Sequence, residues 1–228
     1  MTTCLITGAN RGIGLELARL YSARGADVIA AVRDPGGAAA LTALARATGQ
    51  IAIVELDVRS ERSFDTLHAA LGERRLDILI ANAGVSGPRG GLADPGNTAE
   101  AWQEIFAVNS IGGFLTVQKL VDLVANGGKI ALISSRMGSS SAASGSSYPY
   151  RASKAALSNI GANLAVELKP RGIAVGIYHP GWVKTDMGGQ SADVTVERSA
   201  TGLMARIDAL SLATSGIFED YAGSPISF

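Results

Sequence analysis

The sequence predicts an α/β protein built as a Rossmann-type doubly wound parallel sheet of about seven strands, in one domain spanning residues 1–228. Two observations support this fold class. Short runs of aliphatic and β-branched residues alternate with longer segments of helical pattern, and the connections between them are short. The apolar runs are also continuous rather than alternating, which is typical of parallel strands covered on both faces.

The expected elements follow one another without a repeat or a linker. Strands are expected at 3–7, 27–32, 51–56, 77–81, 128–133 and 173–178, with a weaker one at 216–220. Helices are expected at 12–24, 36–48, 60–74, 99–125, 148–169 and 194–210. Pro35 suits the first turn of the second helix, and Gly25, Gly49 and Gly172 suit helix ends.

Composition narrows the class of protein. Lys and Arg together number 20, as do Asp and Glu, so the formal charge is zero, whereas a nucleic-acid-binding protein would carry a basic excess. No apolar run reaches the roughly 18 residues that span a bilayer, and the first residues lack a signal-peptide pattern. One Cys and two His offer neither a disulfide nor a zinc cluster. We therefore expect a cytoplasmic protein with no nucleic-acid, membrane or metal partner.

Two segments rich in small residues, 84–98 and 138–147, each follow an expected strand. They should lie at the carboxyl ends of the sheet, where open α/β folds bind their ligands. Flexible connection is the alternative interpretation.

The first strand runs into a glycine-rich turn, Thr7-Gly8-Ala9-Asn10-Arg11-Gly12-Ile13-Gly14, before the first helix. Glycines let the backbone turn tightly and let a pyrophosphate approach the helix start, where free N–H groups and the helix dipole favour negative charge. A tight structural turn would also explain three glycines. Their place between a first strand and a first helix favours nucleotide binding.

Six motifs, in one order between residues 3 and 186, make the chain resemble the short-chain dehydrogenase/reductase family. They are T-G-x-x-x-G-x-G at 7–14, Asn82-Ala83-Gly84, Asn109 within Val108-Asn109-Ser110, Ser134-Ser135-Arg136-Met137-Gly138, Tyr150-Arg151-Ala152-Ser153-Lys154 and Pro180-Gly181-Trp182-Val183-Lys184-Thr185. The last residues, 218–228, resemble less specifically the tail of small carbonyl-reductase-like members. The resemblance implies an oxidoreductase that reduces a ketone or aldehyde, or oxidises the alcohol, with a nicotinamide cofactor.

Tyr150 and Lys154 are the expected centre of the chemistry. A phenol has a pKa of about 10, and Lys154, four residues further along a helix, lies on the same face, so its ammonium is expected to lower that pKa. Such a phenol can give a proton to a carbonyl oxygen or take one from an alcohol. An ordinary surface Tyr/Lys pair is the alternative. Tyr148 has Ala152 four residues on and drops out.

Two further residues complete the expected catalytic set. Ser135 is expected to donate to the substrate oxygen, with Ser134 as the alternative and loop solvation as the plain explanation. By resemblance, Asn109 holds a water that passes protons toward Lys154. An Asn on a helix surface is the alternative.

The expected cofactor contacts spread over the same motifs. They are Gly8, Asn10, Arg11, Gly12, Ile13, Gly14, Arg33, Asp57, Val58, Asn82, Ala83, Gly84, Tyr150, Lys154, Pro180, Gly181, Val183 and Thr185. Asp57 resembles the residue that contacts the adenine, and a helix cap is an equal alternative.

Three further residues are expected to have other roles. We expect Cys4 to lie in the core, His179 to pack or form a hydrogen bond, and Trp182 to lie in the core or in the wall of the substrate site.

The end of the second strand predicts NADP as cofactor, with NAD as second choice. NAD-using relatives carry an acidic side chain there that accepts from the ribose hydroxyls, and in this chain Val32 takes that position with Arg33 next. A guanidinium can bind a 2′-phosphate through two hydrogen bonds. Arg11 could add a second positive contact, and pairing with Asp34 could weaken that of Arg33.

Two other functions compete with carbonyl reduction. A non-catalytic nucleotide-sensing or signalling protein could use the same scaffold, but the Tyr, Lys and Ser are all present. A dehydratase or epimerase using the same Tyr would need a larger substrate region than the chain has after residue 186. The substrate is a small carbonyl compound or alcohol that the sequence does not identify, and the segment 186–198 that should cover its site is short. Small apolar residues in 99–125 and 148–169 lead us to expect a homo-oligomer, a dimer or tetramer.

Overall fold

The computed structural model describes residues 2–228, which form one sheet of seven parallel strands in the order β3-β2-β1-β4-β5-β6-β7. The strands are β1 Thr3–Thr7, β2 Asp27–Val32, β3 Ile51–Glu55, β4 Leu76–Ala81, β5 Val124–Ile133, β6 Ala174–His179 and β7 Phe218–Asp220. The order reverses between β1 and β4, which creates the topological switch point of a doubly wound sheet. The predicted fold class is confirmed.

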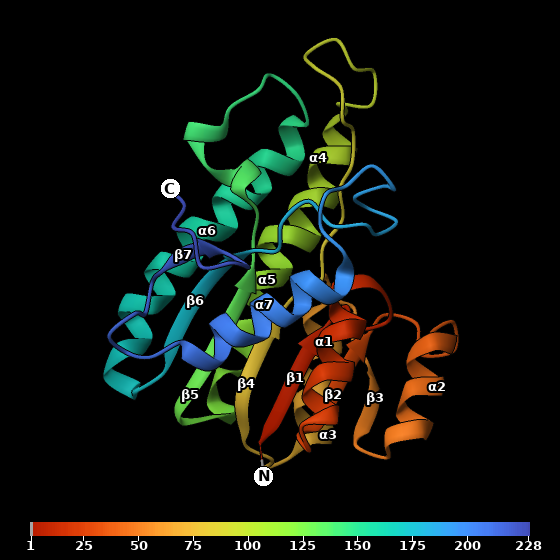
Figure 1. The fold of residues 1–228 in the computed structure, drawn as a ribbon, viewed down its shortest axis with the longest axis vertical. Coiled ribbons are helices and arrows are strands. Elements are labelled where there is room, and N and C mark those ends of the chain that lie inside the picture. The colour runs from red at the N-terminus through yellow and green to blue at the C-terminus, as the bar shows by residue number, and fades with distance from the viewer. Residues whose placement is uncertain (1) are drawn as a thin grey trace.

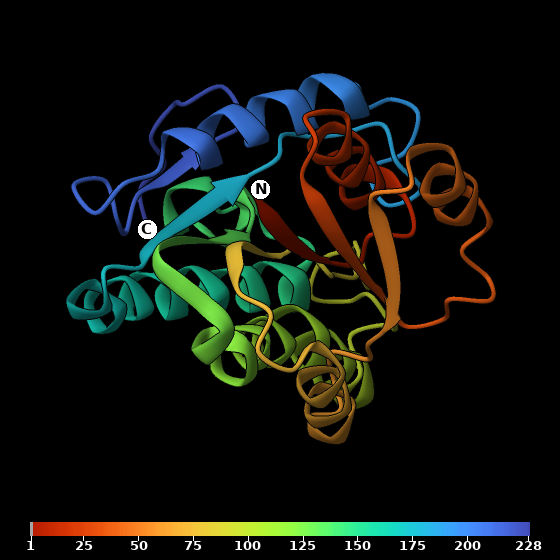
Figure 2. The same ribbon diagram turned by 90° about the horizontal axis from the view of Figure 1, so that it is seen from below.

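Helices cover both faces of the sheet (Figures 1 and 2). They are α1 Gly12–Ala23, α2 Ala39–Thr48, α3 Glu61–Leu71, α4 Ala99–Phe106, α5 Gly112–Leu120, α6 Tyr148–Leu168 and α7 Val196–Ala209. A π-helical turn, Ala107–Ile111, joins α4 to α5. Short 3-10 turns lie at Val121–Leu123, Arg136–Gly138, Ser140–Ala142 and Lys169–Arg171.

Two apolar cores form because the central strands of the sheet bury both of their faces, whereas the edge strand β3 is only partly buried. One core joins the sheet to α3, α5 and α6 through residues such as Phe64, Leu120 and Leu157. The other joins it to α1, α2 and α7 through residues such as Leu17, Leu41 and Leu203. The continuous apolar strands of the sequence are therefore explained by cover on both sides. Cys4 lies fully buried in the second core, as expected.

Two helices differ most from the sequence expectation. The helix expected at 99–125 is interrupted by the π-helical turn and ends early, because β5 already begins at Val124 and pairs with Leu76. The second helix begins at Ala39, not near Pro35, because Asp34 accepts a hydrogen bond from the Gly37 amide and holds a turn there. The expected helix ends hold, since Gly49 and Gly172 adopt the left-handed conformation.

Within residues 2–228, no helix combines the length and the apolar character needed to cross a bilayer.

Candidate active site

The carboxyl ends of β1, β4, β5 and β6 lie along one edge of the sheet, and each is followed by one of the motifs found in the sequence. The loops that leave this edge are at the top of Figure 1. Because parallel strands end together, motifs more than 170 residues apart in sequence meet at one place.

The glycine-rich turn after β1 is shaped by close backbone contacts. Gly8 and Gly12 have φ angles of 67° and 53°, in the left-handed region that favours glycine. A Cβ on Gly14 would lie 2.4 Å from the Gly8 carbonyl oxygen. The Asn82 side-chain amide donates to the carbonyls of Thr7 at 2.9 Å and Gly8 at 3.2 Å. Asn82 thus fixes the turn from the neighbouring strand.

The amino end of α1 is suited to an anion. Arg11 is its N-cap residue and provides no side-chain cap, so the first N–H groups of the helix remain available. The Arg11 guanidinium forms an ion pair of 2.8 Å with Asp186, and both side chains are largely exposed. The turn therefore fits a pyrophosphate through its backbone, while Arg11 is less available for a second positive contact than the sequence suggested.

The ends of β2 and β3 present Arg33 and Asp57. Arg33 is exposed and has no ion-pair partner among the residues that the structure describes, since Asp34 accepts from the Gly37 amide instead. Asp57 accepts a side-chain hydrogen bond from Arg59, which, against a weaker effect of burial, holds the pKa of that carboxyl below its usual range. The helix-cap interpretation of Asp57 is wrong, because Ser60 caps α3 by accepting from the Ser63 amide.

Tyr150 and Lys154 lie one turn apart at the start of α6, and the Lys154 ammonium is 5.9 Å from the centroid of the Tyr150 ring. Lys154 is only 4% exposed, and its ammonium donates to the Ile133 carbonyl at 2.8 Å. Burial lowers the pKa of Lys154 to about 8. A Cβ on Gly84 would lie 3.5 Å from this ammonium, so the motif after β4 also reaches the lysine.

The Tyr150 phenol has its pKa raised, mainly by burial, while the Ser135 hydroxyl and the Arg89 guanidinium oppose the rise. We expected Lys154 to lower the pKa of Tyr150, but the pKa is raised, because desolvation of the phenolate outweighs the effect of the nearby charges. At neutral pH the phenol is protonated, which is the form that can donate to a carbonyl oxygen. Tyr148, by contrast, is 38% exposed.

The two serines after β5 have different hydrogen-bond partners. The Ser134 hydroxyl is buried and donates to the Lys154 carbonyl at 3.0 Å, with the Ser158 hydroxyl 2.7 Å away. Ser135 lies beside Tyr150, and its hydroxyl accepts from the Met137 amide at 3.1 Å. Ser134 thus contacts α6, and Ser135 keeps a hydroxyl proton free to donate.

Asn109 is fully enclosed in the π-helical turn and is not a helix-surface residue. Its side-chain oxygen accepts from the Val85 amide at 2.8 Å, and its amide group donates to the Val85 carbonyl and the Ser153 hydroxyl. Ser153 in turn donates to the Tyr150 carbonyl at 2.8 Å. Asn109 thereby links the loop after β4 to the helix that carries Tyr150.

The segment after β6 approaches the glycine turn. Gly181 has a φ of 88°, and the Pro180 carbonyl accepts from Ser199 at 2.6 Å. A Cβ on Gly12 would lie 3.2 Å from the Thr185 methyl group. Trp182 is half exposed and its indole donates to the Gly188 carbonyl, so it is a surface residue of this segment and not core. The segment completes the ring of loops around Tyr150.

His179 lies behind this segment, and its Nδ1 atom is buried without a hydrogen-bond partner among residues 2–228. Burial lowers the pKa of this imidazole to about 4. Of the two roles expected for His179, the structure therefore favours packing.

Sequence reasoning missed Arg89 and Ser147. Ser147, the N-cap of α6, has a φ of 53°, and its amide donates to the Gly90 carbonyl at 3.0 Å. Arg89 donates to the Met187 carbonyl and so joins the loop after β4 to the segment after β6. Only the three-dimensional contact between these loops reveals either residue.

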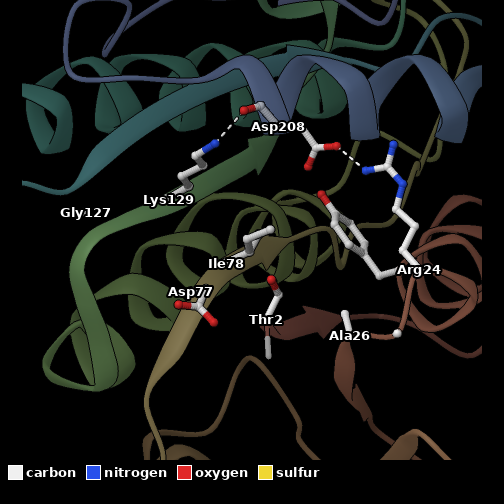
Figure 3. A pocket seen from close by; sticks show the side chains of 10 residues that line it. Thr2, Arg24, Ala26, Asp77, Ile78, Gly127, Lys129 and Asp208 are labelled. Atoms are coloured by element: carbon white, nitrogen blue, oxygen red, sulfur yellow. Dashed lines mark hydrogen bonds and ion pairs between the residues drawn. The ribbon is translucent and has the colours of Figure 1, made fainter.

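A cavity lies at the opposite end of the sheet. It has a volume of about 510 Å³, and its charged lining comes from Arg24, Asp77, Lys129 and Asp208. Arg24 pairs with Asp208, and Lys129 donates to the Asp208 carbonyl (Figure 3). Asp77 accepts a hydrogen bond from the Thr3 amide.

Comparison with known proteins agrees with this geometry. The short chain dehydrogenase family model matches residues 2–195. A 1-hydroxy-2-glutathionyl-2-methyl-3-butene dehydrogenase of a Rhodococcus strain is 33% identical, with 98% of each chain covered. An NADPH-bound carbonyl reductase from chicken fatty liver has a TM-score of 0.91 and 32% identity, covering 100% of this chain and 99% of its own. A carbonyl reductase of Pseudomonas aeruginosa has a TM-score of 0.90 and 36% identity, with 100% of both chains covered.

Proposed function

Since this chain belongs to the short-chain dehydrogenase family, we propose that it is an NADP-dependent reductase of ketones or aldehydes in which Tyr150 is the general acid and base. The observation that carries the proposal is the buried Lys154 ammonium 5.9 Å from the Tyr150 ring, with Ser135 beside the phenol. Membership of the family makes the protein an NAD(P)-dependent oxidoreductase.

The cofactor is held, in this proposal, by the carboxyl edge of the sheet. The uncapped start of α1 would bind the pyrophosphate, Arg33 a 2′-phosphate and Asp57 the adenine side. Pro180, Gly181, Val183 and Thr185 would line the nicotinamide side. When bound, the nicotinamide supplies or accepts the hydride. Two similar structures, from chicken and from Burkholderia multivorans, contain NADPH or NADP, which supports this choice over NAD.

The proton chemistry belongs to the chain's own residues. Ser135 would donate to the carbonyl oxygen, and the protonated Tyr150 would transfer its proton to that oxygen as negative charge develops. Lys154 would then stabilise the phenolate, because a positive charge close to an anion in a buried site is only weakly screened. Asn109 positions this group of residues by joining the Val85 backbone to Ser153.

Turnover of ketones and aldehydes with NADPH and with NADH tests the function and the cofactor together. We expect a higher kcat/KM with NADPH, and we expect Arg33→Ala to reduce that preference because the guanidinium no longer meets the 2′-phosphate. Arg46→Ala, an exposed change at the far end of α2, is the control. A wild-type preference for NADH, or an unchanged ratio in Arg33→Ala, would exclude this role of Arg33.

We also propose that the protein is a homo-oligomer in a reducing cytoplasm. Ile111 and Phe114, beside and within α5, are large apolar side chains that are 52% and 36% exposed. Burial of such side chains against a second copy would be favourable. Sedimentation at micromolar concentration distinguishes an oligomer from a 23.3 kDa monomer.

A further inference from the structure

Arg89 lies between the two loops that border Tyr150. Its backbone belongs to the loop after β4, and its guanidinium donates to the Met187 carbonyl in the segment after β6. Its positive charge reaches the Tyr150 phenol, whose pKa it lowers against the larger effect of burial. The Arg89 carbonyl accepts from the side chain of Ser147, the N-cap of the helix that carries Tyr150, so Arg89 lies beside the amino end of that helix.

The positive charge of Arg89 is not neutralised by the protein. Among residues 2–228, no carboxylate lies within ion-pair distance of this guanidinium. Two other arginines at this edge of the sheet are engaged more fully. Arg11 is paired with Asp186, and Arg151, which also lacks a carboxylate partner, donates to the carbonyls of Ser146 and Ala142. A guanidinium has five N–H groups, and Arg89 uses one of them in its hydrogen bond to Met187. The remaining N–H groups can donate to a bound anion.

The loop holds the backbone of Arg89 in place. The Arg89 carbonyl accepts from the Ser147 hydroxyl at 3.4 Å, and the next carbonyl, of Gly90, accepts from the Ser147 amide at 3.0 Å. The Asp94 carboxylate accepts from the amides of Gly90 at 2.7 Å and Gly96 at 2.8 Å. Ser147 is the N-cap of the helix that carries Tyr150. Its hydrogen bonds therefore fix the position of the Arg89 backbone relative to that helix.

We propose that Arg89 binds a carboxylate of the substrate, and that the substrates preferred by this enzyme are oxo acids. The inference rests on the carbonyl reduction proposed above and names its substrate class. A carboxylate matches the planar guanidinium through two parallel hydrogen bonds, and its single negative charge balances the single positive charge of Arg89. A phosphate monoester would bring a charge closer to two.

The carboxylate takes no part in the chemical step. The carbonyl carbon gains the hydride of the reduced nicotinamide, and the carbonyl oxygen gains the proton of Tyr150, so an oxo acid becomes a hydroxy acid. Arg89 contributes binding and orientation, which place the carbonyl between Ser135 and Tyr150.

The test compares each acid with its primary amide, which has nearly the same shape but no charge. We would measure kcat/KM with NADPH for phenylglyoxylate, 4-oxo-4-phenylbutanoate and their two amides. The proteins are wild type, Arg89→Met, Arg89→Lys and the control Arg74→Met, an exposed arginine between α3 and β4. The measured quantity is the acid-to-amide ratio, which cancels any change in folding or in Tyr150 that affects both substrates.

We expect wild type to favour at least one acid over its amide, and Arg89→Met to lower that ratio about 10- to 100-fold, as for a lost hydrogen bond between charged groups. Arg89→Lys should recover part of the ratio, and Arg74→Met should keep the wild-type value. Equal or better turnover of both amides by wild type, or an unchanged ratio in Arg89→Met, would overturn the inference while leaving carbonyl reduction intact. Absence of turnover with every ketone and aldehyde would remove the proposed function, and the inference with it.

Discussion

Two cations at the carboxyl end of the sheet, Lys154 and Arg89, have no carboxylate partner among residues 2–228, whereas at the amino end Arg24 is paired with Asp208. At the carboxyl end, Lys154 donates to a backbone carbonyl and Arg89 has no carboxylate partner in the part of the chain that the structure describes. At the amino end, Arg24 and Lys129 both contact Asp208 around a cavity of about 510 Å³. The volume of a cavity therefore indicates function less well than the presence of charged groups that are free to bind a ligand.

Each end of the sheet also has a tyrosine whose pKa is raised mainly by burial. Tyr150 lies beside Ser135 and Lys154, in a motif of the family. Tyr21 lines the cavity at the other end, and its hydroxyl is buried with no hydrogen-bond partner among residues 2–228. The two phenols share an environment of low polarity, and they differ in whether neighbouring groups can take part in proton transfer.

The largest expected effect separates these two tyrosines by activity. Tyr150→Phe should reduce kcat about 10²- to 10⁴-fold, because it removes the proton donor at the carbonyl. NADPH affinity, measured by titration calorimetry, should remain close to that of wild type. Tyr21→Phe is the matched control and should keep full turnover. Substantial turnover by Tyr150→Phe on a good substrate would show that another group supplies the proton.

The second effect concerns the buried charge of Lys154. Its pKa is about 8 in the folded protein and 10.5 in the unfolded chain, so the unfolded chain holds the proton more tightly. Burial of the ammonium therefore destabilises the folded protein. This loss in the free energy of unfolding is complete below about pH 8 and disappears as the pH rises toward 10.5.

Urea unfolding of wild type and Lys154→Met, without cofactor, measures this effect. The difference in the free energy of unfolding should change by on the order of 2 to 4 kcal/mol between pH 7 and pH 10.5, in favour of wild type at high pH. Contributions of Cys4 and the tyrosines are common to both proteins and cancel. A difference that does not vary with pH would mean that Lys154 has an ordinary pKa.

The smallest effect is on stability at the amino end. Tyr21→Phe removes a hydroxyl that is buried without a partner, so we expect the free energy of unfolding to rise by about 1 kcal/mol. Thermal and urea unfolding would both detect this change. A loss of stability instead would indicate that the hydroxyl is hydrogen-bonded, for example to water in the cavity.

The sequence was sufficient for the fold because most strands are continuous apolar runs with glycines at several of the turns. It could not place the start of β5, because Val124 and Ala125 also continue the helical pattern before them. The six motifs predicted Tyr150, Lys154, Ser135 and Asn109 as the catalytic set. The structure places Lys154 and Ser135 beside Tyr150 and joins Asn109 to Ser153, and the catalytic roles stay a prediction. The direction of the Tyr150 pKa shift depends on burial, which residue spacing does not contain.

Arg89 escaped prediction for a related reason. Its loop is rich in glycine and proline, and nothing in its pattern distinguishes this arginine from a solvated one. Its position follows from the side chain of Asp94 and the backbone of Ser147, which are contacts between loops. The partners of Ser134 were likewise not predictable from the sequence, because they lie 20 and 24 residues away along the chain.

The π-helical turn at Ala107–Ile111 makes the register of its helix sensitive to length as well as to composition. A π-turn holds one residue more than an α-turn, and it lets Asn109 and Ser110, which are adjacent in sequence, both contact Ser153. Converting this stretch to regular α-helix with all of its residues kept would rotate everything after it by about 100°. Gly113, which now allows Leu157 to approach closely, would then face elsewhere. Changes that remove the π-turn but keep its residues should therefore be far less acceptable in evolving sequences than point changes on the exposed face of the same helix.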